Sequence, residues 1–112
     1  MIVPFETMEY EVKPNLRDGM GDTLMKTFKD DFNKIMIIKI DPGCSIGMHQ
    51  HVGNSEIYYT LSGKGKVNNG DGTVDYVKPG DCHYCPKECS HEAICDGDEP
   101  WIFFAMVPEH NK

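Results

Sequence analysis

The chain has 112 residues, which suit one compact domain and leave no room for a second hydrophobic core. It carries 18 acidic residues against 11 basic ones, and the net charge of −7 opposes attraction to the phosphates of nucleic acids. No stretch approaches the roughly 18 apolar residues of a membrane span, and the N-terminal segment lacks the basic region of a signal peptide. We expect a single domain over residues 1–112 and a cytoplasmic protein.

Cysteine content and core size add two expectations. The five cysteines are an odd number, so they cannot all pair within one chain, and a reducing compartment is the simpler setting. Hydrophobic residues make up 39% of the chain, and a small core supplies limited stability on its own. A bound metal or a partner subunit would add stability, and we therefore expect a homodimer.

The first part of the chain alternates between apolar and polar residues, which is the pattern of β-strands. Met8 to Val12 alternates ahead of Pro14, and Asn15 to Asp22 contains glycines that favour a tight loop or flap. Thr23 to Lys29 resumes the alternation. Lys34 to Ile40 is nearly all apolar, which is typical of a strand buried on both faces.

The second part of the chain continues as short strands separated by turns. Asn69-Gly70-Asp71-Gly72 indicates a hairpin turn, because these dipeptides favour positive φ. Further strands are expected at residues 66–68, 73–77, 82–85, from 89 through His91 and at 101–107, before a frayed tail from Pro108 to Lys112. About ten short strands without a helical period predict an all-β sandwich or barrel.

Three histidines and a glutamate have the spacing of a metal site. His49 and His51 are two residues apart, so on a strand both side chains point to the same face. A polar connection that contains Gly53 then turns the chain back, so that Glu56 joins them from the next strand. His91 supplies a fourth ligand from a later strand. Three imidazoles and one carboxylate suit a divalent transition metal such as manganese, iron, nickel or zinc.

These residues resemble the two sequence motifs of the cupin superfamily. The first motif, residues 43–63, is matched at every defining position by Gly43, His49, His51, Glu56 and Gly63. The second motif, residues 80–95, is recognisable in Gly80-Asp81, Pro86 and His91, with Glu88 where glycine is common and Cys95 where asparagine is frequent. The resemblance implies that the all-β fold is a double-stranded β-helix, a jelly-roll barrel with a site inside.

Within the superfamily, the chain is similar to small bacterial cupins grouped with oxalate decarboxylases. The similarity lies in the short chain, in the segment Ser45 to His51 and in the Arg-x-Gly-x-Gly run that begins at Arg17. It implies a metalloenzyme that binds a small, anionic carboxylate or sugar-acid substrate on the metal and polarises it for decarboxylation, oxygenation or isomerisation. A non-catalytic module that binds or senses a small ligand is the alternative, and a purely structural metal is a third hypothesis.

Three residues are candidates for a catalytic role, each beside a simpler interpretation. Tyr58 shares the strand face of Glu56 and can line the cavity, although packing in the core explains its position as well. Arg17 can bind an anionic substrate through its guanidinium, or lie solvated on the surface. Glu88, in the bend before His91, can act as an acid or base at the cavity mouth, or be an exposed turn carboxylate.

The cysteines offer a competing metal site. Cys82, Cys85 and Cys89 have the spacing of a zinc knuckle, but residues three apart on a strand face opposite sides, so Cys82 and Cys85 should not converge. Cys95 shares the face of His91 and is expected toward the barrel interior, where a thiol could tune the metal. The remaining histidines, His83 and His110, are expected to be non-ligands.

Overall fold

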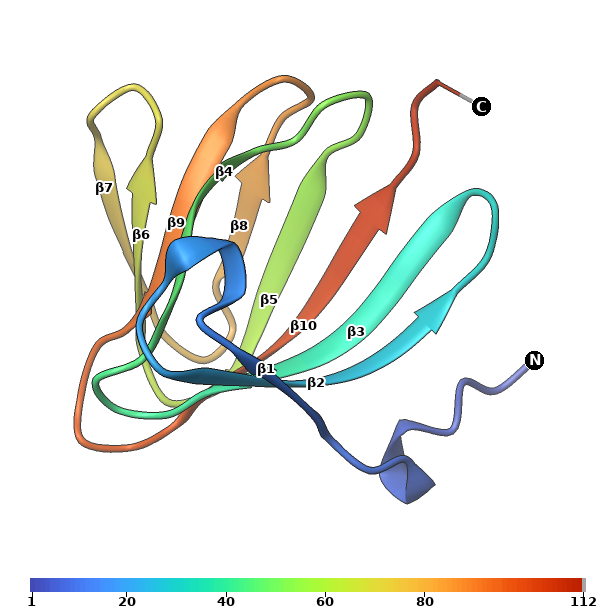
Figure 1. Ribbon diagram of the computed structural model, residues 1–112, viewed down its shortest axis with the longest axis horizontal. Coiled ribbons are helices and arrows are strands. Elements are labelled where there is room, and N and C mark those ends of the chain that lie inside the picture. Colours follow the sequence, from blue (N-terminus) through green and yellow to red (C-terminus); the bar gives the residue numbers. More distant parts are fainter. Residues whose placement is uncertain (112) are drawn as a thin grey trace.

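The computed structural model describes residues 1–111, which form two antiparallel β-sheets around one core (Figure 1). The larger sheet has the strand order β1-β2-β3-β10-β5-β8 and the smaller one the order β4-β9-β6-β7. The strands are β1 (Glu11–Pro14), β2 (Asp22–Lys29), β3 (Asn33–Ile40), β4 (Ser45–Gln50), β5 (Glu56–Ser62), β6 (Gly65–Asn69), β7 (Val74–Val77), β8 (Cys82–Cys85), β9 (Ser90–Cys95) and β10 (Trp101–Pro108). The helical segments of the described chain are two 3-10 turns, η1 (Phe5–Thr7) and η2 (Leu16–Asp18). None of its helices has the length and apolar character needed to cross a membrane.

Strands from distant parts of the chain lie side by side in both sheets. The last strand, β10, pairs with β3 on one side and with β5 on the other, and β9 lies between β4 and β6. This interleaving is the jelly roll of a double-stranded β-helix, so the expected fold class is confirmed. The hairpin predicted at residues 69–72 is also present, because β6 and β7 pair on either side of it.

The core between the sheets follows from the alternation of the strands. Along β10, Trp101, Phe103, Ala105 and Val107 are buried, while the residues between them are half-buried. The Trp101 indole N–H donates a hydrogen bond to the Thr60 hydroxyl at 3.1 Å, and its ring centroid lies 4.2 Å from that of Phe103. The aromatic rings fill the core at the start of β10, whereas Val107 near its end lines a cavity.

The larger sheet has an apolar outer face. The prediction that residues 34–40 are buried on both faces is wrong, because Met36 and its inward-facing neighbours are buried while Ile35 and Ile37 on the outer face are only half-buried. The apolar run thus indicates burial correctly on one side. On the other side of this sheet the N-terminal segment contacts β2, where the Lys26 ammonium donates a hydrogen bond to the Phe5 carbonyl at 2.9 Å, and within residues 1–111 no further strand lies over it.

The first and ninth strands begin later than the sequence predicted. β1 begins at Glu11 rather than Met8, and it includes Pro14. Proline is tolerated there because β1 is an edge strand, where one row of backbone groups has no ladder partner. β9 begins at Ser90 rather than Cys89.

The C-terminal tail is held in place rather than frayed. The Glu109 N–H donates a hydrogen bond to the Phe32 carbonyl at 2.7 Å, and His110 Nε2 lies 2.8 Å from the Ser55 hydroxyl. The expectation of a frayed tail is therefore wrong for residues 108–110. The part of that expectation that concerns Lys112 lies outside the described residues.

Candidate metal centre

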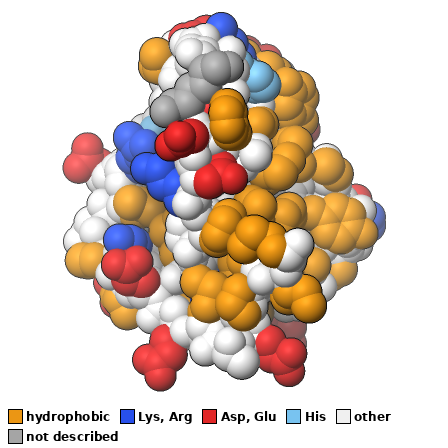
Figure 2. All heavy atoms as spheres, turned by 90° about the vertical axis from the view of Figure 1, so that its right-hand side faces the viewer, with side chains coloured by type: hydrophobic (Ala, Val, Ile, Leu, Met, Phe, Trp, Pro, Cys, Tyr) orange, Lys and Arg blue, Asp and Glu red, His pale blue; other side chains and the backbone are white. Residues whose placement is uncertain are grey.

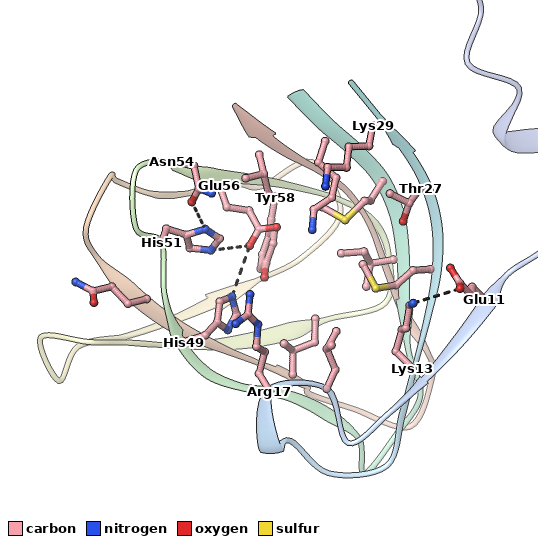
Figure 3. Close-up of a pocket in the computed structure, with 18 of the residues that line it drawn as sticks. Glu11, Lys13, Arg17, Thr27, Lys29, His49, His51, Asn54, Glu56 and Tyr58 are labelled. Carbon is pink, nitrogen blue, oxygen red and sulfur yellow. Dashed lines mark hydrogen bonds and ion pairs between the residues drawn. The ribbon is translucent and has the colours of Figure 1, made fainter. Parts of the chain in front are cut away.

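Four side chains from three separate segments of the chain meet inside the barrel. His49 lies in β4 and is the cross-strand partner of His91 in β9. His51 follows the end of β4, and the chain then turns back so that Glu56 begins β5. One ligand atom from each of the four residues lies within 4.8 Å of the other three. The structure thus assembles the cluster that the spacing predicted, and Figure 3 shows His49, His51 and Glu56 around the cavity.

The separations of the ligand atoms match the corners of one coordination shell. His91 Nε2 lies 3.0 Å from His51 Nε2, 3.2 Å from His49 Nε2 and 3.0 Å from Glu56 Oε1. Glu56 Oε1 lies 3.1 Å from His51 Nε2 and 4.0 Å from His49 Nε2. Atoms held about 2.1 Å from one ion are about 3.0 Å apart when they are neighbours in an octahedron and about 4.2 Å apart when they are opposed. Four short separations and one long one fit that pattern.

Hydrogen bonds behind two of the rings fix which nitrogen carries the proton. His49 Nδ1 donates to the Gly47 carbonyl at 2.7 Å, and His51 Nδ1 donates to the side-chain oxygen of Asn54 at 2.9 Å. A neutral imidazole carries one proton, so both Nε2 atoms turn lone pairs toward the centre, the arrangement found in metal-binding histidines. Two such lone pairs beside the Glu56 carboxylate repel one another unless a cation lies among them. The donor set therefore fits a divalent metal ion.

Burial and neighbouring charge set the pKa values of the ligands. Burial lowers the pKa of His49 to about 4, so its imidazole is neutral at pH 7. Burial would raise the pKa of Glu56, but hydrogen bonds from His51 and His91 hold that pKa at about 2. At His51 the effect of burial is outweighed by the Glu56 carboxylate, which raises the pKa of the imidazole. The ionised carboxylate thus stabilises a positive charge at the centre, whether a proton on His51 or a metal ion.

Tyr58 lies against the cluster with its hydroxyl toward it. The hydroxyl oxygen lies 3.4 Å from His91 Nε2, and the two ring centroids are 5.0 Å apart in a stacked arrangement. Burial raises the pKa of Tyr58 well above its usual value of 10.0, so the hydroxyl stays neutral. Tyr58 both lines the cavity and packs in the core, so its position is consistent with both interpretations of the sequence.

The cluster opens onto a cavity of about 680 Å³. Apolar side chains from both sheets form part of its wall: Met25, Met36, Ile38, Ile46 and Val107. Basic side chains also line it: Lys13, Arg17, Lys29 and Lys34. Pockets of about 300 to 1,000 Å³ hold drug-sized ligands, so this cavity has room for more than a few atoms beside the metal.

Arg17 is the second candidate residue that the structure brings to the cavity. Its backbone φ of 56° and the φ of 63° at Asp18 lie in the left-handed region, which costs a non-glycine residue about 1 to 2 kcal/mol. Burial and the charge of Arg17 both oppose the rise in the pKa of His51 that Glu56 causes. Figure 3 shows Arg17 beside His49 at the edge of the cavity, so a surrounding framework holds this strained loop at the cavity.

That framework is the contact of β4 with η2 and with the residues that follow η2. The Met20 N–H donates to the Ser45 hydroxyl at 3.0 Å, and the Ser45 N–H donates to the Met20 carbonyl at 2.8 Å. Gly47 faces the loop so closely that a Cβ atom there would overlap the Arg17 carbonyl oxygen. The absence of a side chain at this point lets the loop reach the cavity.

Glu88 lies outside the cavity lining, at the bend before β9. Its carboxylate accepts a hydrogen bond from the Gly53 N–H at 2.9 Å, and its own N–H donates to the His51 carbonyl at 2.7 Å. These contacts brace the turn that carries His51 and Glu56. Glu88 therefore supports this turn, and its carboxylate does not lie at the cavity as an acid or base.

The cysteine positions favour the simpler interpretations. Cys82 is exposed and Cys85 is buried, so they face opposite sides as predicted, and the described chain has no clustered metal ligands that include a cysteine. Cys95 is buried as expected, but its thiol donates to the Glu99 carbonyl at 3.2 Å and does not line the cavity. Cys85 is the cross-strand partner of Glu56, and burial raises the pKa of its thiol to about 11, with contributions from Cys89 and Glu56.

Three residues of the site were missed by sequence reasoning. Asn54 holds the proton of His51 in place, and Lys29 and Lys34 line the cavity. The signal for Lys29 was present, because the alternation of residues 23–29 puts it on the same face as Met25. Its pairing with Lys34 depends on the register of the β2–β3 hairpin, which the sequence alone did not fix.

A jelly roll that brings three histidines and a glutamate together inside the barrel defines the class of metal-binding cupins. The family model described as a cupin domain matches residues 36–107, and the chain belongs to this family. Similar proteins fall into two groups. The oxalate-binding protein of Thermotoga maritima is 30% identical over 113 residues, covering 96% of this chain and 93% of its own length. Glucose-6-phosphate isomerase of Thermococcus litoralis is 33% identical over 64 residues, but the match covers 54% of this chain and only 34% of the isomerase.

A solved structure supports the same assignment. The crystal structure of a predicted oxalate decarboxylase from Thermotoga maritima superposes with a TM-score of 0.90 at 28% sequence identity. The superposition covers 97% of this chain and 99% of that one. The fold and the family are therefore shared over nearly the whole chain, whereas the isomerases share only part of their length with it.

Proposed function

We propose that this protein is a metal-dependent cupin that binds a small carboxylate directly on a divalent metal ion held by His49, His51, Glu56 and His91. The observation that carries the proposal is the position of Arg17, an exposed guanidinium held beside this cluster at the same cavity. A carboxylate bound there would meet a metal ion on one side and a two-pronged hydrogen-bond donor on the other. The oxalate-binding relative supports an anion of this kind.

The metal would supply Lewis-acid chemistry by withdrawing electrons from a bound carboxylate oxygen. The residues of the chain would orient the ligand. The Arg17 guanidinium would pair with the ligand's carboxylate, and the neutral Tyr58 hydroxyl can donate a hydrogen bond to it. The apolar wall would limit the access of water. These roles serve decarboxylation, oxygenation or isomerisation of a carboxylate or sugar acid. They also serve simple binding, so turnover decides between an enzyme and a binding or sensing module.

Replacing Arg17 with alanine should weaken oxalate binding to the metal-loaded protein by about 10- to 150-fold. This range corresponds to about 1.5 to 3 kcal/mol for hydrogen bonds to a charged group. Titration calorimetry with manganese-, nickel- or zinc-loaded protein measures the affinity, and product formation from oxalate and related acids is followed in the same samples. Lys87→Ala, at an exposed lysine outside the cavity, is the control. Equal affinity in Arg17→Ala and wild type would contradict the proposal.

We also propose that a second copy of the chain covers the outer face of the larger sheet. This face carries Tyr59, Leu61 and Tyr84, which are 44%, 48% and 57% exposed, beside the half-buried Ile35 and Ile37. Figure 2 shows hydrophobic side chains gathered over a broad area on this side of the molecule. Contiguous apolar patches of this kind are uncommon on monomers. In a symmetric dimer the same face of each subunit would pack against the other, which removes both patches from water.

A charge on this face should separate the subunits. We expect the wild type to sediment as a dimer at micromolar concentration and Leu61→Glu to sediment as a monomer, because two carboxylates would be buried without partners in the symmetric contact. Val74→Glu, at an exposed apolar residue on β7 of the other sheet, is the control and should leave the dimer intact. A monomeric wild type would overturn this proposal.

A further inference from the structure

Two lysines face the cavity from the hairpin opposite the Arg17 loop. Lys29 ends β2 and Lys34 lies in β3, and the two residues are directly opposite each other in the β2–β3 register. Met25 and Thr27 line the cavity from the same face of β2, so the alternation of the strand directs Lys29 inward with them. Figure 3 shows Lys29 on the far side of the cavity from Arg17.

The placement of the two lysines is unfavourable without a partner. Like charges directly opposite each other in an antiparallel pair destabilise the sheet. Among residues 1–111, no carboxylate lies within 4.0 Å of either ammonium group, whereas Lys13, which lines the same cavity, pairs with Glu11 at 3.2 Å. The chain carries a net charge of −7, whereas four cationic side chains and only two acidic ones, Glu11 and Glu56, line this cavity.

Three acidic residues, Asp30, Asp31 and Glu109, line a hollow beside this hairpin together with the two lysines. Asp30 lies in the turn that follows Lys29, and its carboxylate accepts hydrogen bonds from the N–H groups of Phe32 and Asn33 at 2.9 and 2.8 Å. Glu109 accepts a hydrogen bond from the Asn54 side chain at 3.3 Å. Among residues 1–111, none of these three carboxylates forms an ion pair with Lys29 or Lys34 within 4.0 Å, so both ammonium groups are able to bind an anion.

We propose that Lys29 and Lys34 form a second anion site, which binds a phosphate at the far end of a ligand whose carboxylate is on the metal. This inference rests on the proposed function and extends it to the class of ligand: an acid that carries a phosphate. Lysine binds phosphate as a compact point charge, and two opposed ammonium groups match a dianion. Oxalate, whose two carboxylates are joined directly, would leave most of the cavity of about 680 Å³ without ligand atoms.

Matched pairs of acids test this site by titration calorimetry with the metal-loaded protein. The pairs are glycerate with 3-phosphoglycerate and gluconate with 6-phosphogluconate, and oxalate reports on the metal end alone. In wild type we expect the phosphate to increase affinity at least tenfold in one pair. In the double variant Lys29→Gln/Lys34→Gln this gain should fall to threefold or less, while the affinity for oxalate stays within twofold.

A charge-matched control separates a local site from a general loss of positive charge. The double variant Lys39→Gln/Lys66→Gln removes two cations that do not line the cavity, and it should keep the full gain. No gain in wild type, or an equal gain in the variant that lacks Lys29 and Lys34, would overturn the second site alone. If oxalate, glycerate and gluconate all fail to bind the metal-loaded wild type, the proposed function fails, and the inference that rests on it fails as well.

Discussion

Replacing His91 with glutamine is expected to abolish the stabilisation that divalent metal gives to this protein. His91 is fully buried, and its Nε2 lies within 3.2 Å of the ligand atoms of the other three residues, so it is the centre of the cluster. A metal present at a hundred times its dissociation constant stabilises the folded state by about 2.7 kcal/mol. For a domain of this size each kcal/mol raises Tm by about 4 to 8 °C, so wild type should gain roughly 10 to 20 °C.

The measurement is the change in Tm when manganese, nickel or zinc is added to metal-free protein. Comparing each variant with and without metal removes the effect of the substitution on the fold itself, and glutamine retains most of the volume of the buried ring. His110→Gln is the matched control, because His110 is exposed and bonds to Ser55 rather than to the cluster. A metal-dependent shift in His91→Gln as large as in wild type would refute a site centred on this residue.

The residues of the candidate metal site were predictable because local geometry brings three of them together. The sequence places His49 and His51 two residues apart, a spacing that puts both side chains on one face of an extended segment. A glycine-containing turn then brings Glu56 back beside them, so three of the four positions follow from a short segment. His91 lies 35 residues after Glu56, so the sequence offered it as a fourth ligand on a later strand, and the family motif supported that choice. The structure supplies the physical reason, which is the pairing of His91 with His49 across β4 and β9.

The residues that the sequence misplaced are those whose position depends on distant contacts. Cys95 shares a face with His91 as predicted. The interior of the barrel extends beyond the metal cluster, however, and the Cys95 thiol donates a hydrogen bond to the Glu99 carbonyl there. An apolar strand such as β3 indicates that its residues avoid water. It does not indicate whether the covering layer is the same chain or a second copy, which is why Ile35 and Ile37 were assigned to the core.

Substituting alanine for Gly19 is expected to move the Arg17 loop away from the metal centre while leaving the metal ligands in place. A Cβ atom at Gly19 would overlap the Ser45 carbonyl oxygen and lie 2.7 Å from the Gly47 nitrogen, so backbone must shift. The φ of −76° at Gly19 is normal for any residue, and the effect is therefore one of space. Overpacking of this kind costs about 1 to 3 kcal/mol of the free energy of unfolding.

The loop, rather than β4, should make the adjustment. β4 is paired with β9 and carries His49, whereas Arg17 and Asp18 of η2 are exposed and have left-handed backbone conformations whose strain a shift would relieve. Metal affinity should thus stay within about threefold of wild type, because a loop shift changes none of the hydrogen bonds of the ligands. Oxalate affinity should fall as far as it does in Arg17→Ala, because a displaced guanidinium no longer reaches an anion beside His49.

Calorimetric titration with metal and then with oxalate, together with urea unfolding, separates these effects. If Gly19→Ala loses stability but binds oxalate as tightly as wild type, the position of Arg17 does not depend on this backbone contact. If the variant loses metal affinity as well, the strain has passed into β4 through Gly47, whose carbonyl accepts a hydrogen bond from His49 Nδ1 at 2.7 Å. Loss of oxalate binding with metal binding retained would establish that the glycine contact serves to carry the cation to the metal-bound ligand.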